Sequence, residues 1–318
     1  MKTYNIAIIG ATGLVGREVL KILQKKTLTN HKFVFYASAK SQGKIINFNN
    51  KQYRVKTLSK SSLNKYKFDF AMFCVGEDVS RQYVNALADS GCVVIDFSSA
   101  FRKSHPLVVP EVNPQDIQGN IICNPNCSTI GAVVALNKIS QTFGLDRIIY
   151  STYQAVSGAG KLSLDALYNK KPLPKTGVEI VDNIVPYIGD IDTQGYSKEE
   201  NKMIFETKKI LHLKDTYITA TCVRVPVDVG HSESINFQTK TPTDCEQILT
   251  VLYNTPGVRV VSTPMPTYVK GQNDVLVGRL RKDEYENSFN IFVVVDNLRK
   301  GAAQNGVQIL EMLINGNI

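Results

Sequence analysis

A glycine-rich turn near the N-terminus constrains the fold of this 318-residue chain most. It follows a short apolar run at residues 4–9 and precedes residues 17–23, whose apolar side chains are spaced as on one face of a helix. This order predicts a strand, a glycine turn and a helix. Glycines let the backbone turn sharply and approach a pyrophosphate, and the helix N-terminus favours the anion. The spacing is GxxGxxG rather than GxGxxG, and it predicts dinucleotide binding by Gly10, Ala11, Thr12, Gly13, Leu14, Val15 and Gly16.

The end of the next predicted strand, residues 32–37, indicates which dinucleotide binds. An enzyme that uses NAD carries Asp or Glu there, against the 2′-hydroxyl of the ribose. This chain continues instead with Ser38, Ala39, Lys40 and Ser41, whose hydroxyls, ammonium and backbone N–H groups suit a 2′-phosphate. We therefore predict NADP as the cofactor, with Ser38, Lys40 and Ser41 among its contacts. The alternative interpretation is a polar surface loop.

Strands and helices continue to alternate after this loop. Apolar runs at residues 68–75 and 92–97 flank a helix-like stretch at about 78–89. This alternation predicts a doubly wound parallel sheet of the Rossmann type. Arg102 follows the run at 92–97, at the carboxyl end of a strand, where open sheets bind ligands. It is a candidate contact to an anion or, alternatively, a solvated loop arginine.

A turn at residues 124–129, Asn-Pro-Asn-Cys-Ser-Thr, joins a short apolar run to a long helix-like one. Cys127 is therefore expected near the first turn of a helix, where unpaired N–H groups and the helix dipole favour a thiolate. This makes Cys127 a candidate nucleophile. Alternatively, the Asn, Pro and Ser residues only form a turn and cap the helix, and Cys127 is a small buried residue.

Composition limits the class of protein. The chain is 43% hydrophobic and 20% charged, which is typical of a globular protein with about two domains. The N-terminus runs directly into a predicted strand, and no apolar run approaches the ~18 residues that span a bilayer, so we expect a cytoplasmic protein. The six cysteines form no CxxC pair, so neither a disulfide framework nor a zinc site is expected. The net charge of +9 comes from dispersed lysine pairs, which favours small anionic ligands over nucleic acid.

The second half of the chain predicts a different architecture. A strand at 147–155 carries Gln154, and a flexible turn follows. Residues 161–216 are polar and irregular except for a helix-like piece at 198–211. Strands are then expected at 219–227, 233–239, 274–280 and 288–295, the first two antiparallel and joined through residues 228–232. Arg224 and His231 fall near the edge of that sheet.

These patterns predict an α/β protein with two domains. Residues 1–127 and 298–318 form the NADP-binding domain, because an amphipathic C-terminal helix is expected to pack back on it. Residues 128–297 form an α+β domain with a mixed, largely antiparallel sheet.

Seven motifs in sequence order carry a family resemblance. They are GATGLVG at 10–16, SSAFR at 98–102, NPNCST at 124–129, YQAVSGAG at 153–160, EENK at 199–202, RVPVDVGHSES at 224–234 and DNLRKGAAQN at 296–305. With this order and spacing, the chain resembles the aspartate-semialdehyde dehydrogenases. The resemblance implies that the domain at 128–297 serves catalysis and dimerisation, in a homodimer or a dimer of dimers.

The resemblance also implies roles for individual residues. Cys127 is the nucleophile, Gln154 orients it, and His231 acts as acid and base. Arg224 binds the substrate carboxylate and Glu199 the substrate amino group. The residues that match the phosphate site are Arg102, Lys202 and Asn126. Further cofactor contacts are implied at Ser157, Gly158, Asn297 and Gln304.

The expected reaction is the NADPH-dependent conversion of L-aspartyl 4-phosphate to L-aspartate 4-semialdehyde through a cysteine thioester. A thiolate, a histidine and a nicotinamide are the groups that interconvert an aldehyde and an activated acyl group. The alternative is a reductase of the N-acetyl-glutamyl-phosphate type, in which the amino group is acetylated. Glu199 favours the first reaction because a carboxylate suits a free ammonium. A non-catalytic NADP-binding protein with a structural cysteine is a further alternative.

Overall fold

The computed structural model describes residues 2–316, which form two compact units. The first unit comprises Met1–Pro125 and Ala302–Ile318, and the second comprises Asn126–Gly301. Asn126 and Cys127 therefore belong to the second unit, whereas the sequence prediction placed them in the first. The reason is local, because Cys127 begins a helix that packs mainly against strands and helices of the second unit.

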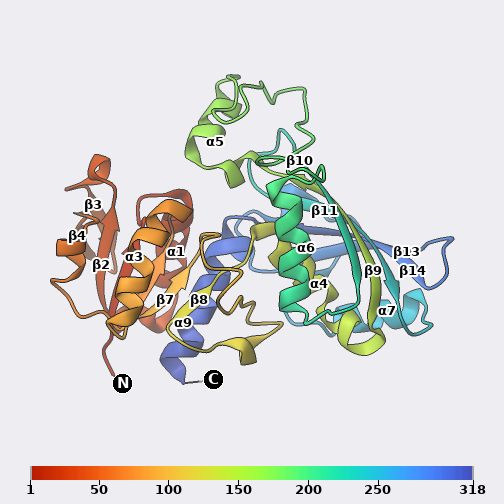
Figure 1. The fold of residues 1–318 in the computed structure, drawn as a ribbon, viewed down its shortest axis with the longest axis horizontal. Helices are drawn as coiled ribbons and strands as arrows, with labels where there is room; N and C mark the ends of the chain where they lie inside the picture. The colour runs from red at the N-terminus through yellow and green to blue at the C-terminus, as the bar shows by residue number, and fades with distance from the viewer. Residues whose placement is uncertain (1, 317–318) are drawn as a thin grey trace. The chain divides into compact units, whose positions relative to one another are not determined.

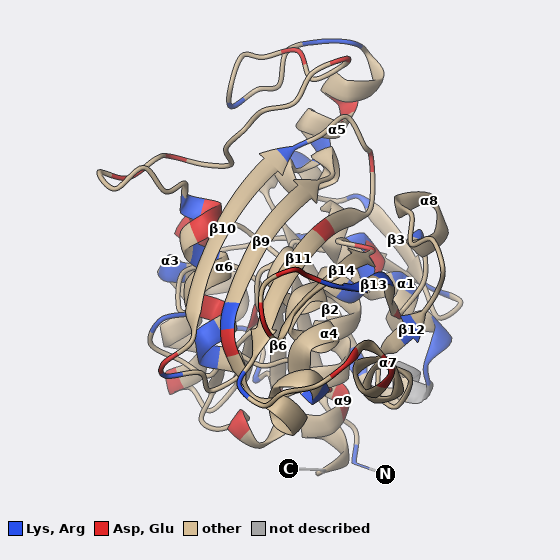
Figure 2. Ribbon diagram, turned by 90° about the vertical axis from the view of Figure 1, so that its right-hand side faces the viewer, with Lys and Arg blue, Asp and Glu red and all other residues tan. Residues whose placement is uncertain are grey.

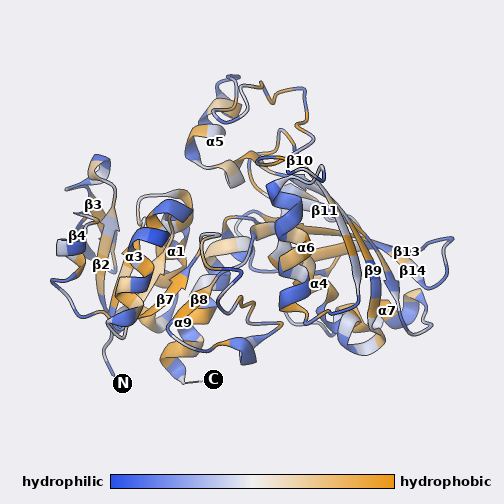
Figure 3. Ribbon diagram, in the orientation of Figure 1, coloured by the Kyte–Doolittle hydropathy of each residue, from blue (hydrophilic) through white to orange (hydrophobic). Residues whose placement is uncertain are grey.

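The first unit contains the predicted parallel sheet. Its strands lie in the order β5-β2-β1-β6-β7-β8, and every neighbouring pair is parallel. Short apolar strands buried on both faces are typical of such a sheet, and Figure 3 shows the hydrophobic residues of β7 and β8. The strands are β1 (Asn5–Ile9), β2 (Lys32–Ala37), β5 (Lys56–Thr57), β6 (Phe70–Phe73), β7 (Val93–Asp96) and β8 (Ile121–Cys123).

Helices cover this sheet. Side chains of α1 and α9 join one hydrophobic core with alternate residues of the strands, and α3 packs against β7 and β8. Figure 1 shows that α9, from the end of the chain, lies beside strands from its first third, as the sequence predicted. The sequence did not predict the hairpin of β3 and β4 or helix α2. The bounds are α1 (Leu14–Lys25), α2 (Lys60–Leu63), α3 (Glu77–Asp89), α9 (Asn305–Asn315), β3 (Ile45–Phe48) and β4 (Lys51–Arg54).

The second unit contains the predicted mixed sheet. Its strands lie in the order β10-β9-β11-β14-β13-β12, with parallel pairs at the two edges and antiparallel pairs between them. The prediction that β10 and β11 form a neighbouring antiparallel pair was wrong, because β9 lies between them and pairs with both. The strands are β9 (Leu145–Gln154), β10 (Tyr217–Arg224), β11 (His231–Thr239), β12 (Val258–Val260), β13 (Val275–Lys282) and β14 (Ser288–Val295).

Helix α4 (Cys127–Phe143) is the central helix of this unit. It packs against β9, β11, β13 and β14 of the sheet and against the helices α6 (Lys198–Ile210) and α7 (Cys245–Tyr253). Most of its side chains are fully buried. Because α4 is buried over most of its length, closely packed neighbours surround the helix that Cys127 begins.

A long segment, residues 155–197, leaves the sheet after β9 and precedes α6 and β10; we call it the excursion. In Figures 1 and 2 it loops beyond the ends of these two strands. It contains helix α5 (Lys161–Tyr168), which the sequence did not predict, and a small core of its own made by Val156, Ala166, Leu173, Ile180 and Val185. No helix in residues 2–316 is long and apolar enough to cross a membrane.

Candidate active site

The site is organised around the start of α4. Asn126 is the N-cap, and its side-chain oxygen accepts hydrogen bonds from the backbone N–H groups of Ser128 (3.0 Å) and Thr129 (3.3 Å). Cys127 is the first helical residue. The NPNCST turn therefore has the predicted strand–turn–helix form, and it places a thiol where helix N–H groups and the dipole stabilise a thiolate.

His231 lies beside this thiol. Its Nε2 is 3.1 Å from the Sγ of Cys127, and the backbone N–H of Ala155 donates to its Nδ1 at 2.9 Å. Because Nδ1 accepts that hydrogen bond, a neutral imidazole must carry its proton on Nε2. The proton therefore points toward Cys127, and the ring can donate a hydrogen bond to the sulfur.

The surroundings keep this imidazole neutral. His231 is fully buried. Burial and the positive charge of Arg224 lower the pKa of His231 to about 3, and the Glu199 carboxylate offsets only part of this effect. An imidazolium would also have to break the bond from Ala155 to Nδ1. The geometry and the electrostatics thus agree that His231 is an uncharged donor at neutral pH.

Arg224 ends β10 next to Gln154 of β9. It is buried, and its Nη1 donates to the carbonyl oxygen of Ala155 at 2.7 Å. Burial lowers the pKa of Arg224, and the charge of Glu199 opposes that shift. A Cβ on Gly158 would lie 3.1 Å from Nη1 of Arg224 and 3.3 Å from Cε1 of His231, so glycine leaves room for both side chains.

A polar cluster at the start of α6 combines two charged side chains, Glu199 and Lys202, with the amide of Asn126 from the start of α4. Asn126 Nδ2 donates to Glu199 Oε1 at 2.7 Å, and Lys202 Nζ lies 3.0 Å from Glu199 Oε2. Burial would raise the pKa of Glu199, but Lys202 and the hydrogen bond from Asn126 outweigh it and hold this pKa at about 2. Glu199 is therefore an anion that can attract an ammonium group.

The second unit also holds Gln154 and two of the predicted cofactor residues, Ser157 and Asn297. Gln154 is buried, and its amide donates to Thr152 at 3.3 Å. Asn297 donates to the hydroxyl of Ser157 at 3.0 Å and accepts from the N–H of Gly230 at 2.9 Å. These bonds hold the turn after β9 against the segment that leads into His231.

A cavity of about 690 Å³ opens next to Arg224. The chain excursion after β9 contributes most of its lining, including Tyr187 and Asp190, and α6 contributes Lys198. A small polar substrate could therefore reach the Arg224 guanidinium from this side.

In the first unit, the glycine loop has the form that the sequence predicted. Gly10 has φ +85°, and a Cβ there would lie 2.3 Å from the carbonyl oxygen of Cys74. A Cβ on Gly16 would lie 2.2 Å from the carbonyl oxygen of Gly10. The N-cap of α1 is Gly13, which has no side chain to cap the helix, so the N–H groups of its first turn suit a pyrophosphate.

The remaining predicted cofactor residues of this unit fall at and near the loop. Thr12 Oγ1 donates to the hydroxyl of Ser41 at 3.2 Å, which joins the glycine loop to the segment after β2. Ser38 and Lys40 of that segment are exposed. Gln304 is buried, and its Oε1 has no hydrogen-bond partner among residues 2–316. Hydroxyl and ammonium groups at this loop, and an amide acceptor at Gln304, are therefore available to a dinucleotide.

Arg102 is not the solvated arginine of the alternative interpretation. It is buried, and its Nη2 donates to the carbonyl oxygen of Phe97 at 2.9 Å. This contact anchors the loop after β7. A role for Arg102 toward phosphate remains a prediction.

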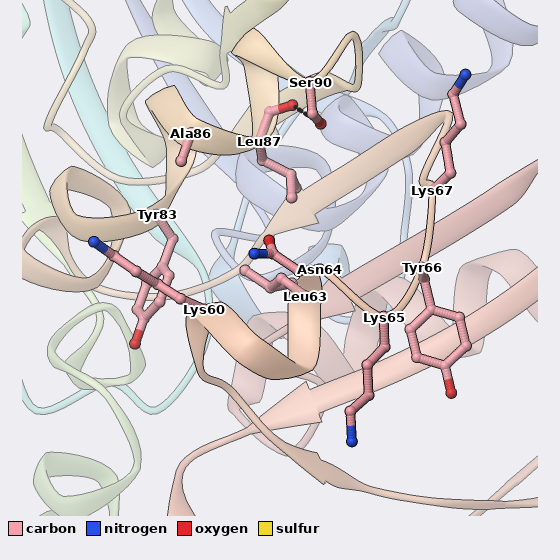
Figure 4. A pocket seen from close by; sticks show the side chains of 10 residues that line it. All are labelled: Lys60, Leu63, Asn64, Lys65, Tyr66, Lys67, Tyr83, Ala86, Leu87 and Ser90. Carbon is pink, nitrogen blue, oxygen red and sulfur yellow. Dashed lines mark hydrogen bonds between the residues drawn. The ribbon is translucent and has the colours of Figure 1, made fainter.

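The first unit has a pocket of about 320 Å³ between α2 and α3. Lys60, Lys65 and Lys67 line it, but Figure 4 shows that their side chains point in different directions. Their ammonium groups therefore do not converge on a common anion.

The basic residues of α6 in the second unit do not form a cluster either. Lys and Glu residues are interspersed along this helix (Figure 2), so its positive charge is balanced locally.

Comparison with known proteins identifies the family. A model of the semialdehyde dehydrogenase NAD binding domain matches residues 5–120, and one of the semialdehyde dehydrogenase dimerisation domain matches residues 136–300. An aspartate-semialdehyde dehydrogenase of Aquifex aeolicus is 45% identical over 98% of both chains. The chain belongs to the aspartate-semialdehyde dehydrogenase family. It is an enzyme of this class, and its first unit is a nucleotide-binding domain of the NAD(P) type.

Solved structures of aspartate-semialdehyde dehydrogenases share this fold. The aspartate semialdehyde dehydrogenase II of Vibrio cholerae, complexed with ASA, has a TM-score of 0.95 and 39% identity over the whole of both chains. The enzyme of Candida albicans with NADP has a TM-score of 0.78 and 26% identity over 99% of both chains.

Two contacts of the site were not foreseen from the sequence. The Ala155 N–H acts through the backbone, so no side-chain pattern could have indicated it. The second contact is made by Glu206, whose Oε2 accepts from the N–H of Asn126 at 2.7 Å and which the sequence analysis did not single out. Its spacing of seven from Glu199, which places both on one helix face, was the available signal.

Proposed function

We propose that this enzyme reduces L-aspartyl 4-phosphate to L-aspartate 4-semialdehyde with NADPH, through a thioester on Cys127. The observation that carries the proposal is the pair formed by Cys127 Sγ and His231 Nε2, 3.1 Å apart at the start of α4. A thiolate at a helix N-terminus, with a neutral donor beside it, is a strong nucleophile near pH 7.

Cys127 carries the acyl group. Its thiolate attacks the acyl carbon of the substrate, and the bond from that carbon to the phosphate oxygen breaks, so inorganic phosphate leaves with the electron pair. When bound, the reduced nicotinamide supplies the hydride that turns the thioester carbonyl into a tetrahedral oxyanion. The oxyanion re-forms its C=O bond, the C–S bond breaks, and the aldehyde leaves with the thiolate regenerated.

His231 donates a hydrogen bond at each stage of this sequence. Its Nε2–H faces the sulfur in the resting enzyme, and an oxyanion on the carbon attached to sulfur forms within reach of the same proton. The bond from Ala155 to Nδ1 favours this neutral role over proton uptake by the ring. The sequence had suggested an acid and base; the geometry supports a fixed donor.

Four charged side chains suit the two ends of this substrate. Arg224 offers a planar guanidinium to the α-carboxylate. Glu199, an anion held beside Asn126, suits a free ammonium and not an acetylated amine. Lys202 offers a positive charge to the phosphate, a role we also propose for Arg102. This set favours aspartyl phosphate over N-acetyl-glutamyl phosphate.

For the cofactor, we propose NADP in preference to NAD. The glycine loop accommodates the pyrophosphate, and Ser38, Lys40 and Ser41 suit the 2′-phosphate. The amide oxygen of Gln304, and Ser157, Gly158 and Asn297 at the turn after β9, are proposed as further contacts.

The cellular setting follows from the reaction. We propose that the product supplies lysine, diaminopimelate, methionine and threonine biosynthesis in the cytoplasm. We also propose that the second unit forms a homodimer, alone or within a dimer of dimers.

A phosphate-dependent assay of NADP reduction tests the function. Aspartate semialdehyde should be oxidised, and N-acetyl-glutamate semialdehyde should not. Cys127→Ala should abolish turnover and leave NADPH binding, measured by nicotinamide fluorescence, unchanged. Appreciable turnover by Cys127→Ala contradicts the covalent scheme, and a preference for the acetylated aldehyde contradicts the substrate assignment.

A further inference from the structure

One face of α6 holds the start of α4. Glu199, Met203 and Glu206 are spaced by four and three residues, so they lie on the same side of the helix. Each contacts the first turn of α4. Glu199 and Glu206 bind Asn126, and the Thr129 hydroxyl donates to the sulfur of Met203 at 3.4 Å.

The two carboxylates bind different groups of the same N-cap residue. Glu206 Oε2 accepts from the backbone N–H of Asn126, and Glu199 Oε1 accepts from its side-chain amide, both at 2.7 Å. The side-chain oxygen of Asn126 in turn accepts from the helix N–H groups. The residue that precedes Cys127 is therefore held through its backbone donor, its amide donor and its acceptor.

Glu206 differs from Glu199 in its surroundings. It is only 1% exposed, and it binds backbone. A carboxylate that accepts from N–H groups at a helix N-terminus forms a charge-assisted hydrogen bond and complements the dipole. This bond places the negative charge of Glu206 on the backbone N–H of the residue next to Cys127, and a negative charge there opposes ionisation of the thiol. Glu206 thus holds the turn before Cys127 and also makes the Cys127 thiol harder to ionise.

We propose that Glu206 is a positioning residue for the nucleophile. It fixes the backbone of Asn126 and hence the first turn of α4, so that the sulfur of Cys127 stays within hydrogen-bond distance of His231 Nε2. The negative charge of Glu206 keeps the thiolate basic and therefore more nucleophilic. This inference rests on the proposed role of Cys127 as nucleophile.

Two substitutions separate the geometric effect from the charge effect. Glu206→Gln keeps the shape and an acceptor oxygen but removes the charge. Glu206→Leu removes the acceptor as well. Glu200→Gln is the matched control, because Glu200 is a buried carboxyl on the same helix that binds the N–H groups of Ser197 and Cys222, and not α4.

The first measurement is the rate at which iodoacetamide alkylates Cys127 in the full-length enzyme as a function of pH, with the modified peptide identified by mass spectrometry. For Glu206→Gln we expect the pH of half-maximal rate to fall by about one unit, because a nearby like charge is removed. For Glu206→Leu we expect that pH to lie above the value for Glu206→Gln, because both variants lose the charge but only the leucine leaves the Asn126 N–H without its acceptor and frees the start of α4. Glu200→Gln should leave it unchanged.

The second measurement is steady-state kinetics with aspartate semialdehyde. Glu206→Leu should lower kcat by about 10- to 100-fold, the effect of a small displacement of a reacting group, with little change in KM. A folded Glu206→Leu enzyme that keeps both the kcat and the alkylation profile of the wild type overturns the inference. If that variant does not fold, Glu206→Gln decides, and an unshifted alkylation profile overturns the inference. Both results leave the proposed function standing, because that function is tested separately by Cys127→Ala and by the choice between the two semialdehydes.

Discussion

His231→Asn should weaken the dependence of stability on acid pH. In the folded protein the pKa of His231 is lowered from 6.5 to about 3, first by burial and then by the charge of Arg224. Between these two values the unfolded chain binds a proton that the native state does not bind. Stability therefore falls as the pH falls through 6.5, at about 1.4 kcal/mol per pH unit, and stops falling near pH 3. At pH 5.0, roughly 1.5 units below 6.5, the loss from this one group is about 2 kcal/mol.

The assay is urea unfolding followed by far-ultraviolet circular dichroism at pH 7.5 and pH 5.0. The wild-type enzyme should lose about 2 kcal/mol more than His231→Asn between these values. His212→Asn is the control, because His212 is exposed and its φ of 54° suits asparagine. It should behave as the wild type does. Equal losses for wild type and His231→Asn refute the conclusion that the native imidazole stays neutral.

Three further outcomes follow from the site. Arg224→Lys should raise KM for aspartate semialdehyde by about 10- to 100-fold, because a point charge does not replace the planar fork, and unchanged kinetics removes Arg224 from the site. Glu233 is fully buried, burial raises its pKa well above the usual range, and neither carboxyl oxygen has a hydrogen-bond partner within the described part of the chain. The wild-type enzyme should therefore lose free energy of unfolding as the pH rises above about 4.5, because the unfolded chain releases this proton more easily than the native state does. Glu233→Gln removes that loss, so the free energy of unfolding of the variant minus that of the wild type, measured by urea unfolding, should be larger at pH 8 than at pH 5. An equal difference at both pH values contradicts this. Lys40→Ala should raise KM for NADPH about tenfold with little effect on NADH, and an equal effect on both argues against a 2′-phosphate contact.

Local rules made part of the fold predictable. Strand β2 was predicted with its observed bounds, because Lys32–Ala37 is a single apolar run ended by a polar loop. The N-terminus of α4 was also predicted, since an Asn cap and a following apolar run define a helix start within a few residues. Helix α5 was missed because it is only eight residues long and two of its apolar residues, Leu162 and Tyr168, are exposed, so no one-sided apolar pattern marks it.

Partners far apart in the sequence could not be read from local patterns. The insertion of β9 between β10 and β11 depends on how the sheet closes, and the order of strands along the chain favoured the wrong pairing. Glu206 was missed for the same reason, because its partner Asn126 lies 80 residues away. Family resemblance suggested that Cys127 and His231 act together, but it did not supply the tautomer.

The sequence by itself determined the turn that presents Cys127, the glycine loop and the residue types available for chemistry, because each depends on sterics and capping within a few residues. Only the tertiary structure decided how those groups behave. It brings His231 to Cys127 across 104 residues, directs the Ala155 N–H to Nδ1, and excludes water from the imidazole. Hydrogen-bond direction and charge depend on packing between distant segments, so a residue's chemistry here is a property of the folded chain.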